Sequence, residues 1–317
     1  MVKVLLVDPA LAMLRDRFAE RLPSDVEVAV VADFGDEEFR RLAADATVLV
    51  NARRPIDAST LAMAPATRLI QMIGAGTDTI DRAAAGRAGI TVAFNPGVNR
   101  SGAAEHAVML MLALMKRLSS TERATRAGRF APGEIIADGI DDLADATVGL
   151  VGMGHIGQAV AARLAPFGST IVYHARHPVP GVVGLAAGPL PLPELLATAN
   201  IVSLHIPLTP DTQHLIGERE MASMPPGSYL INTGRGGLVD EGALRAAILR
   251  GHLAGAGLDV LEHETDGVNP FADLPQVIVT PHLGGGSRNS MEGVVERSTS
   301  NIRRFLAGEP VRDPVVA

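Results

Sequence analysis

Short runs of β-branched and other apolar residues alternate along this chain with longer stretches in which apolar positions recur at helical spacing. This alternation is typical of α/β proteins with parallel sheets, because each parallel strand needs a crossover helix to reach the next strand. The predicted strands form two series, the first at residues 2–7, 26–31, 47–50, 69–73 and 91–93, and the second at 147–151, 170–173, 201–205, 228–232, 257–260 and 277–280. Predicted helices include 10–21, 36–44, 157–167, 241–250 and a last amphipathic helix at about 289–306.

A long helix is predicted between the two series, from about residue 101 to about residue 118. It follows the turn signal of Asn95, Pro96 and Gly97. A chain of 317 residues is long enough for two modest domains, each with its own core. We therefore expect two α/β domains, with an irregular loop at residues 176–193, where Gly, Pro and Val are frequent.

Composition and charge narrow the possible functions. The net charge of −7 argues against nucleic acid or an anionic membrane as the main partner, because both need clustered positive charge. The absence of cysteine excludes disulfides, thiolate nucleophiles and cysteine-bound metals. The nine histidines are scattered without metal-ligand spacing, so no metal site is expected. The N-terminal residues are typical of a strand and not of an export signal, and the longest apolar stretch, 107–115, is too short to span a bilayer, so a cytosolic protein is expected.

A glycine-rich turn is the sharpest local motif. Gly152, Gly154 and Gly157 follow the apolar run 147–151 and precede the helical pattern 158–167. In a dinucleotide-binding turn the first glycine permits the tight turn, the second lets the backbone approach a pyrophosphate, and the third allows close packing of helix on strand. The motif predicts dinucleotide binding, although glycines at this spacing also serve ordinary turns.

The next predicted strand, 170–173, should end near an acidic residue if the cofactor were NAD. Ala175 stands there instead, followed by Arg176 and His177, which could meet a 2′-phosphate. These residues favour NADP, with NAD as the alternative. The competing interpretation is that both side chains are only solvated loop residues.

Three polar residues follow apolar runs of the second series: Arg235, Glu264 and His282. Ligands of open α/β sheets bind beyond the carboxyl ends of the strands. An arginine fork can bind a carboxylate and polarise an adjacent carbonyl, and a histidine held by a carboxylate can deliver a proton. Each residue alone is weak support, and their shared position after strands predicts reduction of a 2-oxo acid.

At these residues the chain resembles the D-isomer-specific 2-hydroxyacid dehydrogenase family, over nearly its whole length. The matching segments are 74–78 (GAGTD), 80–81 (ID), Asn99, 104–106 (AEH), 152–157 (GMGHIG), 205–212 (HIPLTPDT), 232–236 (NTGRG), 258–260 (LDV) and 280–285 (TPHLGG). The resemblance implies a Rossmann-type cofactor domain at 100–284, inserted into a flavodoxin-like substrate domain of 1–99 plus 285–317. It also implies an active site in a cleft that domain closure would shield from water, and a homodimer to which the long helix contributes.

The resemblance also implies roles for single residues. Arg235 would bind the substrate, His282 would be the acid/base and Glu264 its partner. The implied cofactor contacts are Gly152, Gly154, His155, Ile156, Gly157, Ala175, Arg176, His177, His205, Pro207, Thr212, Thr233 and Asp259, the last of which would hold the nicotinamide carboxamide. The implied substrate contacts are Asn51, Ala52, Arg53 and the backbone of Ala75 and Gly76.

Some residues depart from the family pattern. Thr265 follows the predicted catalytic glutamate where proline is frequent, and Asn51 stands where many relatives carry an arginine, which leaves the substrate's side chain open. We expect an NADP(H)- or NAD(H)-dependent reductase of glyoxylate, hydroxypyruvate or a similar 2-oxo acid. The alternatives are a formate- or phosphite-type dehydrogenase, and a non-enzymatic, corepressor-like protein that senses nucleotides.

Overall fold

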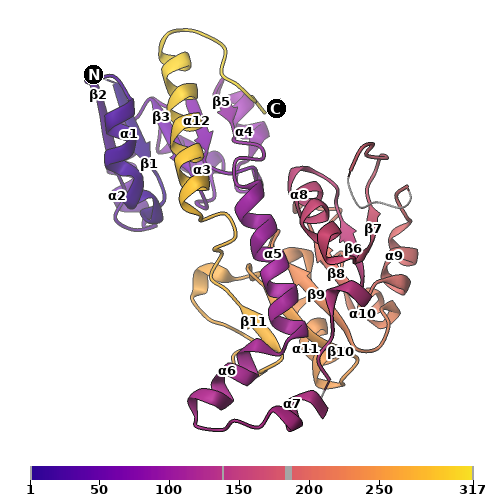
Figure 1. The fold of residues 1–317 in the computed structure, drawn as a ribbon. Helices are drawn as coiled ribbons and strands as arrows, with labels where there is room; N and C mark the ends of the chain where they lie inside the picture. Colours follow the sequence, from indigo (N-terminus) through magenta and orange to yellow (C-terminus); the bar gives the residue numbers. More distant parts are fainter. Residues whose placement is uncertain (1, 138, 183–187, 316–317) are drawn as a thin grey trace. The chain divides into compact units, whose positions relative to one another are not determined.

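The chain folds into two compact units, one formed by residues 1–99 with 287–317 and the other by residues 100–286 (Figure 1). The structure is a computed structural model, and it describes residues 2–137, 139–182 and 188–315. The predicted irregular loop 176–193 therefore lies partly outside the described residues. We call the two parts unit 1 and unit 2, and their assignment to substrate and cofactor stays a prediction.

Unit 1 contains a five-stranded parallel sheet in the order β2-β1-β3-β4-β5. This is the flavodoxin-like order, in which the strand sequence reverses between β1 and β3. The strands are β1 (Val2–Leu6), β2 (Val26–Val30), β3 (Val48–Asn51), β4 (Leu69–Met72) and β5 (Thr91–Ala93). The β-branched runs of the first series thus form strands as predicted.

Helices cover both faces of this sheet because its strands are apolar on both sides. Leu5 and Leu49 face a core with α2 (Asp36–Ala43), α3 (Ala58–Ala62) and α4 (Arg82–Arg87), whereas Leu6 and Val50 face a core with α1 (Arg15–Arg21) and α12 (Arg288–Leu306). The predicted helix 10–21 was wrong in its first half, which is a 3-10 helix, η1 (Pro9–Leu14).

Buried polar side chains fasten the last helix, α12, to the rest of unit 1. Asn301 on α12 donates a hydrogen bond of 2.9 Å to the side chain of Gln71 on β4. Asn95, which follows β5, donates 2.9 Å to Ser298 on the same helix. All four side chains are buried, so their hydrogen bonds specify where α12 docks.

Unit 2 contains a six-stranded parallel sheet in the order β11-β10-β9-β8-β6-β7, so it is doubly wound in the Rossmann manner. The strands are β6 (Thr147–Val151), β7 (Thr170–His174), β8 (Ile201–Leu204), β9 (Ser228–Asn232), β10 (Leu253–Leu258) and β11 (Val277–Val279). The predicted strand 257–260 was misplaced, because β10 begins and ends earlier. The structure confirms the α/β fold class.

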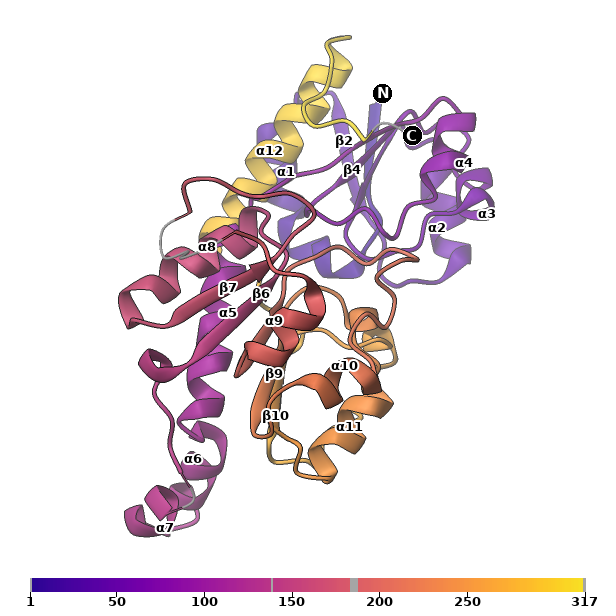
Figure 2. The same ribbon diagram turned by 90° about the vertical axis from the view of Figure 1, so that its right-hand side faces the viewer.

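Two groups of helices cover the sheet of unit 2. One face carries α5 (Arg100–Met115) and α8 (His155–Leu164), and the other carries α9 (Leu192–Thr198), α10 (Glu218–Ser223) and α11 (Glu241–Leu249) (Figure 2). Short 3-10 helices occur at Leu143–Asp145, Ala165–Phe167, Gly236–Leu238 and Glu264–Asp266.

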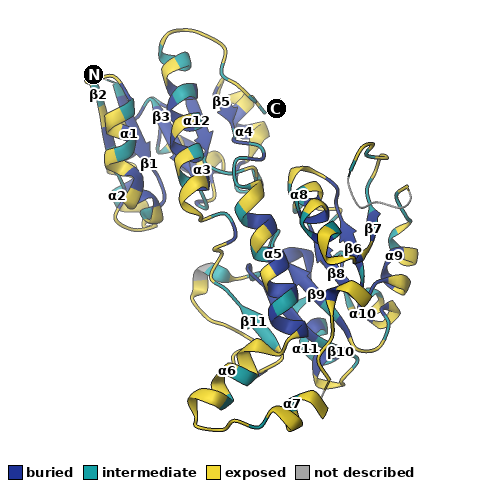
Figure 3. Ribbon diagram, viewed as in Figure 1, coloured by how far each residue is buried: buried dark blue, intermediate teal, exposed yellow. Residues whose placement is uncertain are grey.

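The predicted long helix 101–118 was wrong at its end. It stops at Met115, and Arg117 adopts a left-handed backbone with φ of 48° before α6 (Leu118–Arg126) begins. α6 and α7 (Pro132–Ala137) bury none of their residues, in contrast to the strands and α5 (Figure 3). Among the described residues, no helix is long and apolar enough to cross a membrane.

Candidate functional site

The six strands of unit 2 are parallel, so their carboxyl ends lie along one edge of the sheet. Most of the site residues predicted in this unit follow those ends. The residues next to β6, β7, β8, β9, β10 and β11 are Gly152, Ala175, His205, Thr233, Asp259 and Thr280. The strand order reverses between β6 and β8, and such a reversal opens a crevice for a ligand.

The three glycines after β6 differ in whether the fold itself requires a glycine at that position. Gly152 has a φ of 100°, and a Cβ there would lie 2.4 Å from the carbonyl oxygen of His205. A Cβ at Gly157 would lie 2.1 Å from the carbonyl oxygen of Gly152. A Cβ at Gly154 would meet no described atom within 4 Å. The fold therefore requires Gly152 and Gly157, whereas Gly154 leaves open space beside the backbone, as a bound phosphate would need.

The residues that could meet phosphate groups lie at the start of α8 and after β7. His155 and Ile156 begin α8, where the first backbone N–H groups of a helix lack intrahelical acceptors. Arg176 and His177 are exposed, and no described acidic side chain pairs with either of them. This edge of unit 2 is thus suited to an anion.

The loop after β8 is held by its own hydrogen bonds. The Thr212 hydroxyl donates 2.9 Å to the Pro207 carbonyl and accepts 2.8 Å from the Thr209 amide. Before it, His205 makes a 2.9 Å hydrogen bond with the Ser203 hydroxyl, and burial lowers the pKa of His205 to about 4. His205 is therefore neutral near pH 7, so it contributes a polar side chain to this edge of the sheet but no positive charge.

The turn after β9 presents Arg235 and a hydroxyl without a partner. Asn232 is buried and fixes the turn, because its side chain donates 2.8 Å to the Arg235 carbonyl and accepts 3.0 Å from the Gly234 amide. Arg235 donates 2.8 Å to the Gly234 carbonyl. The Thr233 hydroxyl is buried and has no hydrogen-bond partner among the described residues. A buried hydroxyl of this kind can be satisfied by a ligand.

His282 and Glu264 form a pair, as predicted by analogy with the family. The His282 Nδ1 lies 3.0 and 3.1 Å from the two carboxylate oxygens of Glu264. A carboxylate only accepts hydrogen bonds, so Nδ1 carries a proton and the proton that can be exchanged is at Nε2. Both side chains remain partly exposed, at 36% for His282 and 28% for Glu264, so a small molecule can reach them.

Asp259 is buried and accepts several hydrogen bonds within the chain. Its Oδ1 accepts from the Thr280 hydroxyl at 2.6 Å and from the Leu283 amide at 2.8 Å, and its Oδ2 accepts from the Gly284 amide at 2.7 Å. Burial alone would raise the pKa of Asp259, but these bonds and one from His106 outweigh it and hold the pKa below its ordinary value. Asp259 is therefore ionised at neutral pH, and its predicted contact with a nicotinamide stays a prediction.

In unit 1, the predicted substrate residues follow β3 and β4. Asn51 is completely buried, and its Nδ2 donates 2.9 Å to the Arg54 carbonyl. Arg53 donates to both carboxylate oxygens of Asp8, at 3.0 and 3.2 Å, and Asp8 has no exposed surface. Asn51 thus stabilises the loop through this buried hydrogen bond. Ala52 and Arg53 are the residues of this segment that remain partly exposed.

Ala75 and Gly76 lie in the loop after β4, beside the loop after β3. The structure gives their backbone N–H groups no acceptor within the described part of the chain. Successive N–H groups without acceptors can capture an anion such as a carboxylate. Their predicted role in binding a substrate carboxylate is compatible with this geometry and stays a prediction.

Sequence reasoning assigned no role to two residues, one in each unit, that hold predicted site residues in place. Asp8 fixes Arg53, and His106 on α5 contacts both Thr280 and Asp259. The AEH segment, which matches the family pattern, could have pointed to His106. Nothing in the local sequence could have pointed to Asp8, because it is separated from Arg53 by more than 40 residues. No cluster of three or more His, Asp or Glu suited to a metal ion occurs in residues 2–137, 139–182 and 188–315.

Comparison with known proteins relates this chain to dehydrogenases and reductases of 2-hydroxy and 2-oxo acids. Residues 108–284 match the family model described as D-isomer specific 2-hydroxyacid dehydrogenase, NAD binding domain. The chain is 36% identical to a D-3-phosphoglycerate dehydrogenase of Mycobacterium leprae over 98% of its length, but it spans only 59% of that protein. It is 36% identical to a glyoxylate reductase of Thermococcus litoralis, with coverage of 80% of this chain and 78% of the reductase.

A solved structure resembles the whole chain. The NAD complex of an NAD-dependent formate dehydrogenase from Staphylococcus aureus superposes with a TM-score of 0.89 and 27% identity, covering 100% of this chain and 99% of that one.

Proposed function

Because the chain belongs to the D-isomer-specific 2-hydroxyacid dehydrogenase family, we propose that it transfers a hydride between a nicotinamide dinucleotide and a small 2-oxo or 2-hydroxy acid. The observation that carries this proposal is the pairing of His282 with Glu264 at the edge of the sheet where Arg235 also lies. β9 and β11 are two strand spacings apart, about 10 Å, so Arg235 and His282 can approach the same small molecule.

In the direction of reduction, His282 supplies the proton. Glu264 accepts a hydrogen bond from the Nδ1–H group and orients the ring, so Nε2 donates its proton to the oxygen that was the carbonyl. A bound nicotinamide would supply the hydride to the carbonyl carbon. The products are the 2-hydroxy acid and the oxidised cofactor, and the reverse reaction uses neutral His282 as the base.

Arg235 would bind the carboxylate of the substrate and polarise its carbonyl. A guanidinium presents several N–H donors in a plane, which suits two oxygens on neighbouring carbons. We also propose that the backbone amides of Ala75 and Gly76, for which no acceptor is described, bind a carboxylate.

We propose glyoxylate or hydroxypyruvate, without a phosphate, as the substrate class. Arg53 already pairs with the buried Asp8, and Arg54 is 4% exposed and lies near Asp36. Because these acids compensate the cations of the loop after β3, that loop offers little attraction to a phosphorylated side chain.

The function is tested by the loss of reduced-nicotinamide absorbance with glyoxylate, hydroxypyruvate or 3-phosphohydroxypyruvate, each with NADPH and with NADH. We expect turnover with the first two acids. Faster turnover of the phosphorylated acid would contradict the substrate class. Cofactor binding without turnover of any 2-oxo acid would contradict the activity and favour a nucleotide-sensing protein. In a separate assay with NAD+ or NADP+, a gain of the same absorbance with formate would favour the formate-type alternative.

The residues of unit 2 fit a dinucleotide. The unpartnered Thr233 hydroxyl, the open space at Gly154 and the start of α8 all lie at one edge of the sheet. We expect Gly154→Ala to weaken cofactor binding at least tenfold, because its Cβ would occupy the space that we assign to the pyrophosphate. The measurement is the dissociation constant by quenching or enhancement of cofactor fluorescence, together with the melting temperature.

The matched control is Gly157→Ala. A Cβ there meets the Gly152 carbonyl at 2.1 Å, so this variant should lose stability, whereas Gly154→Ala should melt as the wild type does. Wild-type cofactor affinity in Gly154→Ala would refute the assignment of the pyrophosphate site.

We propose NADP(H) as the preferred cofactor, because Arg176 and His177 are exposed where β7 ends and Ala175 replaces an acid. Arg176→Ala should reduce the ratio of kcat/KM for NADPH to that for NADH roughly tenfold or more, since a charge-assisted hydrogen bond is lost. Arg87→Ala, which removes an exposed arginine of α4 in unit 1, serves as the control for net charge. An unchanged ratio in Arg176→Ala would remove the basis for NADP(H).

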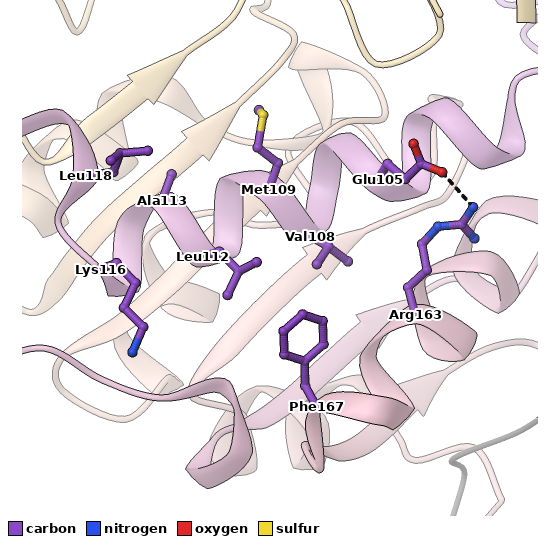
Figure 4. A pocket seen from close by; sticks show the side chains of 9 residues that line it. All are labelled: Glu105, Val108, Met109, Leu112, Ala113, Lys116, Leu118, Arg163 and Phe167. Carbon is purple, nitrogen blue, oxygen red and sulfur yellow. Dashed lines mark hydrogen bonds and ion pairs between the residues drawn. The ribbon is translucent and has the colours of Figure 1, made fainter. Parts of the chain in front are cut away.

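We also propose that the protein is a homodimer that uses the outer face of α5. Figure 4 shows an apolar pocket there, where Phe167 lies next to Val108 and Leu112 and the Glu105–Arg163 ion pair closes one end. Met109 is 45% exposed and Phe167 43% exposed, and both of these large apolar side chains line this pocket.

Light scattering after size exclusion should therefore give twice the chain mass of 33.1 kDa. Met109→Glu should shift this mass toward one chain, because it places a charge in an apolar interface. Met13→Glu is the control, since Met13 is 74% exposed on η1 of unit 1. A monomeric wild type, or a Met109→Glu dimer of unchanged affinity, would contradict this interface.

A further inference from the structure

One residue holds the backbone on which His282 stands. Asp259 accepts hydrogen bonds from three consecutive amides: its carbonyl oxygen accepts from His282 at 2.8 Å, its Oδ1 from Leu283 at 2.8 Å and its Oδ2 from Gly284 at 2.7 Å. His282 has a φ of 56°, in the left-handed region that few residues other than glycine adopt. The interactions with Asp259 thus stabilise an unfavourable backbone conformation at the predicted acid/base residue.

A second layer of contacts orients Asp259 itself. The His106 Nε2 lies 2.8 Å from the Thr280 hydroxyl oxygen and 3.1 Å from Asp259 Oδ1. The Thr280 hydroxyl donates its proton to Oδ1 at 2.6 Å, and the ionised carboxylate only accepts. Nε2 of His106 must therefore carry a proton, which it shares between the two oxygens.

Helix α5 also approaches this segment closely. A Cβ at Gly284 would lie 2.9 Å from Asp259 Oδ2 and 3.6 Å from both the Ala103 Cα and the His106 Cβ. Only glycine allows the segment after β11 to lie against both the carboxylate and the helix. His106 is 12% exposed in its side chain, so its contacts are shielded from water.

We propose that His106 is a positioning residue, which acts through Thr280 and Asp259 to fix residues 282–284 and so the direction of His282. His106 does not touch the reacting atoms; it supplies the N–H that completes the hydrogen bonding of a buried carboxylate. Without this donor, Asp259 would lose one of the hydrogen bonds that offset the cost of burying its charge. Its hydrogen bonds to the amides of residues 282–284 would then be weaker. The catalytic consequence rests on the proposed function, but the structural one does not.

The first test uses the protein without cofactor. Hydrogen exchange by mass spectrometry should show faster exchange of the amides of 282–284 in His106→Leu than in the wild type, and near-wild-type exchange in His106→Gln. Glutamine is the conservative variant because its Nε2 donor lies as far along the side chain as that of histidine.

Ser228→Ala is the matched control for loss of a buried hydrogen bond. Ser228 is 1% exposed and donates a hydrogen bond to the Pro225 carbonyl. It lies at the amino end of β9, whereas His282 follows the carboxyl end of β11. Melting temperatures of all variants separate local loosening from general destabilisation. The proposal is overturned if His106→Leu exchanges like the wild type, if Ser228→Ala loosens 282–284 equally, or if His106→Gln fails to restore protection.

The second test measures steady-state rates with the 2-oxo acid that the wild type reduces best. His106→Leu should lower kcat roughly 10- to 100-fold, as misplacement of a catalytic group does, with a much smaller change in the KM for substrate. His106→Gln should recover most of the loss. An equal loss in Ser228→Ala would overturn the proposal, whereas a wild type without activity would refute the proposed function and leave the exchange test decisive.

Discussion

His282→Asn should lower kcat by about 10²- to 10⁴-fold, which is the usual contribution of a positioned proton donor. Asparagine is chosen because it tolerates the left-handed backbone at this position and because its side-chain amide can replace Nδ1 in the contact with Glu264. It lacks a group equivalent to Nε2, so only the exchangeable proton is removed. The measurement is steady-state kinetics in both directions, with the melting temperature as a check on folding.

Glu264→Gln is the companion variant. Glutamine keeps the size of the side chain but removes its charge, which weakens the hydrogen bond that orients the imidazole, so kcat should fall less than in His282→Asn. In the double variant the two losses should not add, because residues that act as a unit share one contribution. Wild-type kcat in His282→Asn would exclude this residue as the acid/base.

Arg235→Lys should lower kcat/KM by about 10²- to 10³-fold, the range seen when one donor to a developing oxyanion is removed. The substitution keeps the positive charge and removes the planar fork, so it tests the geometry of binding. The local backbone should survive, because Asn232 bonds to the carbonyl of residue 235 and not to its side chain. Initial rates over a range of substrate concentrations separate the effect on KM from the effect on kcat.

Arg245→Lys provides the control within the same unit. Arg245 pairs with Asp273 on the surface, at 2.8 Å for one of its contacts, and changing an exposed ion pair has little effect on stability. Its kinetics should match those of the wild type. If Arg235→Lys behaves in the same way, Arg235 does not bind the reacting carboxylate.

The strands were largely predictable, because β-branched runs bounded by turn residues mark a sheet buried on both faces. β10 was the exception, since its sequence contains Gly255 and Gly257. A Cβ at Gly257 would lie 2.9 Å from the Cβ of Leu110 on α5, and a Cβ at Gly255 would lie 2.4 Å from the carbonyl oxygen of Gln276, so both glycines serve close packing. Requirements of this kind depend on a partner far along the chain and leave no local pattern.

The site was predictable where motif and strand end coincide, as at Gly152 and at the pair of His282 and Glu264. The supporting contacts were not. Asn51 has the polarity expected of a substrate contact but is completely buried, and Asp8 pairs with Arg53 only because β1 and β3 are neighbours. Topology determines such pairs, whereas local sequence determines only the residue types.

The interruption of unit 1 by unit 2 has a consequence for synthesis on the ribosome. α12 supplies Val294, Val295 and Ile302 to the core beside Leu6 and Val50, and it is translated after the whole of unit 2. Unit 2 can therefore complete its fold while one face of the first sheet still lacks its covering helix. The part that is translated first finishes folding last, and a chaperone that shields apolar surface would have to protect that face of the nascent chain until α12 emerges.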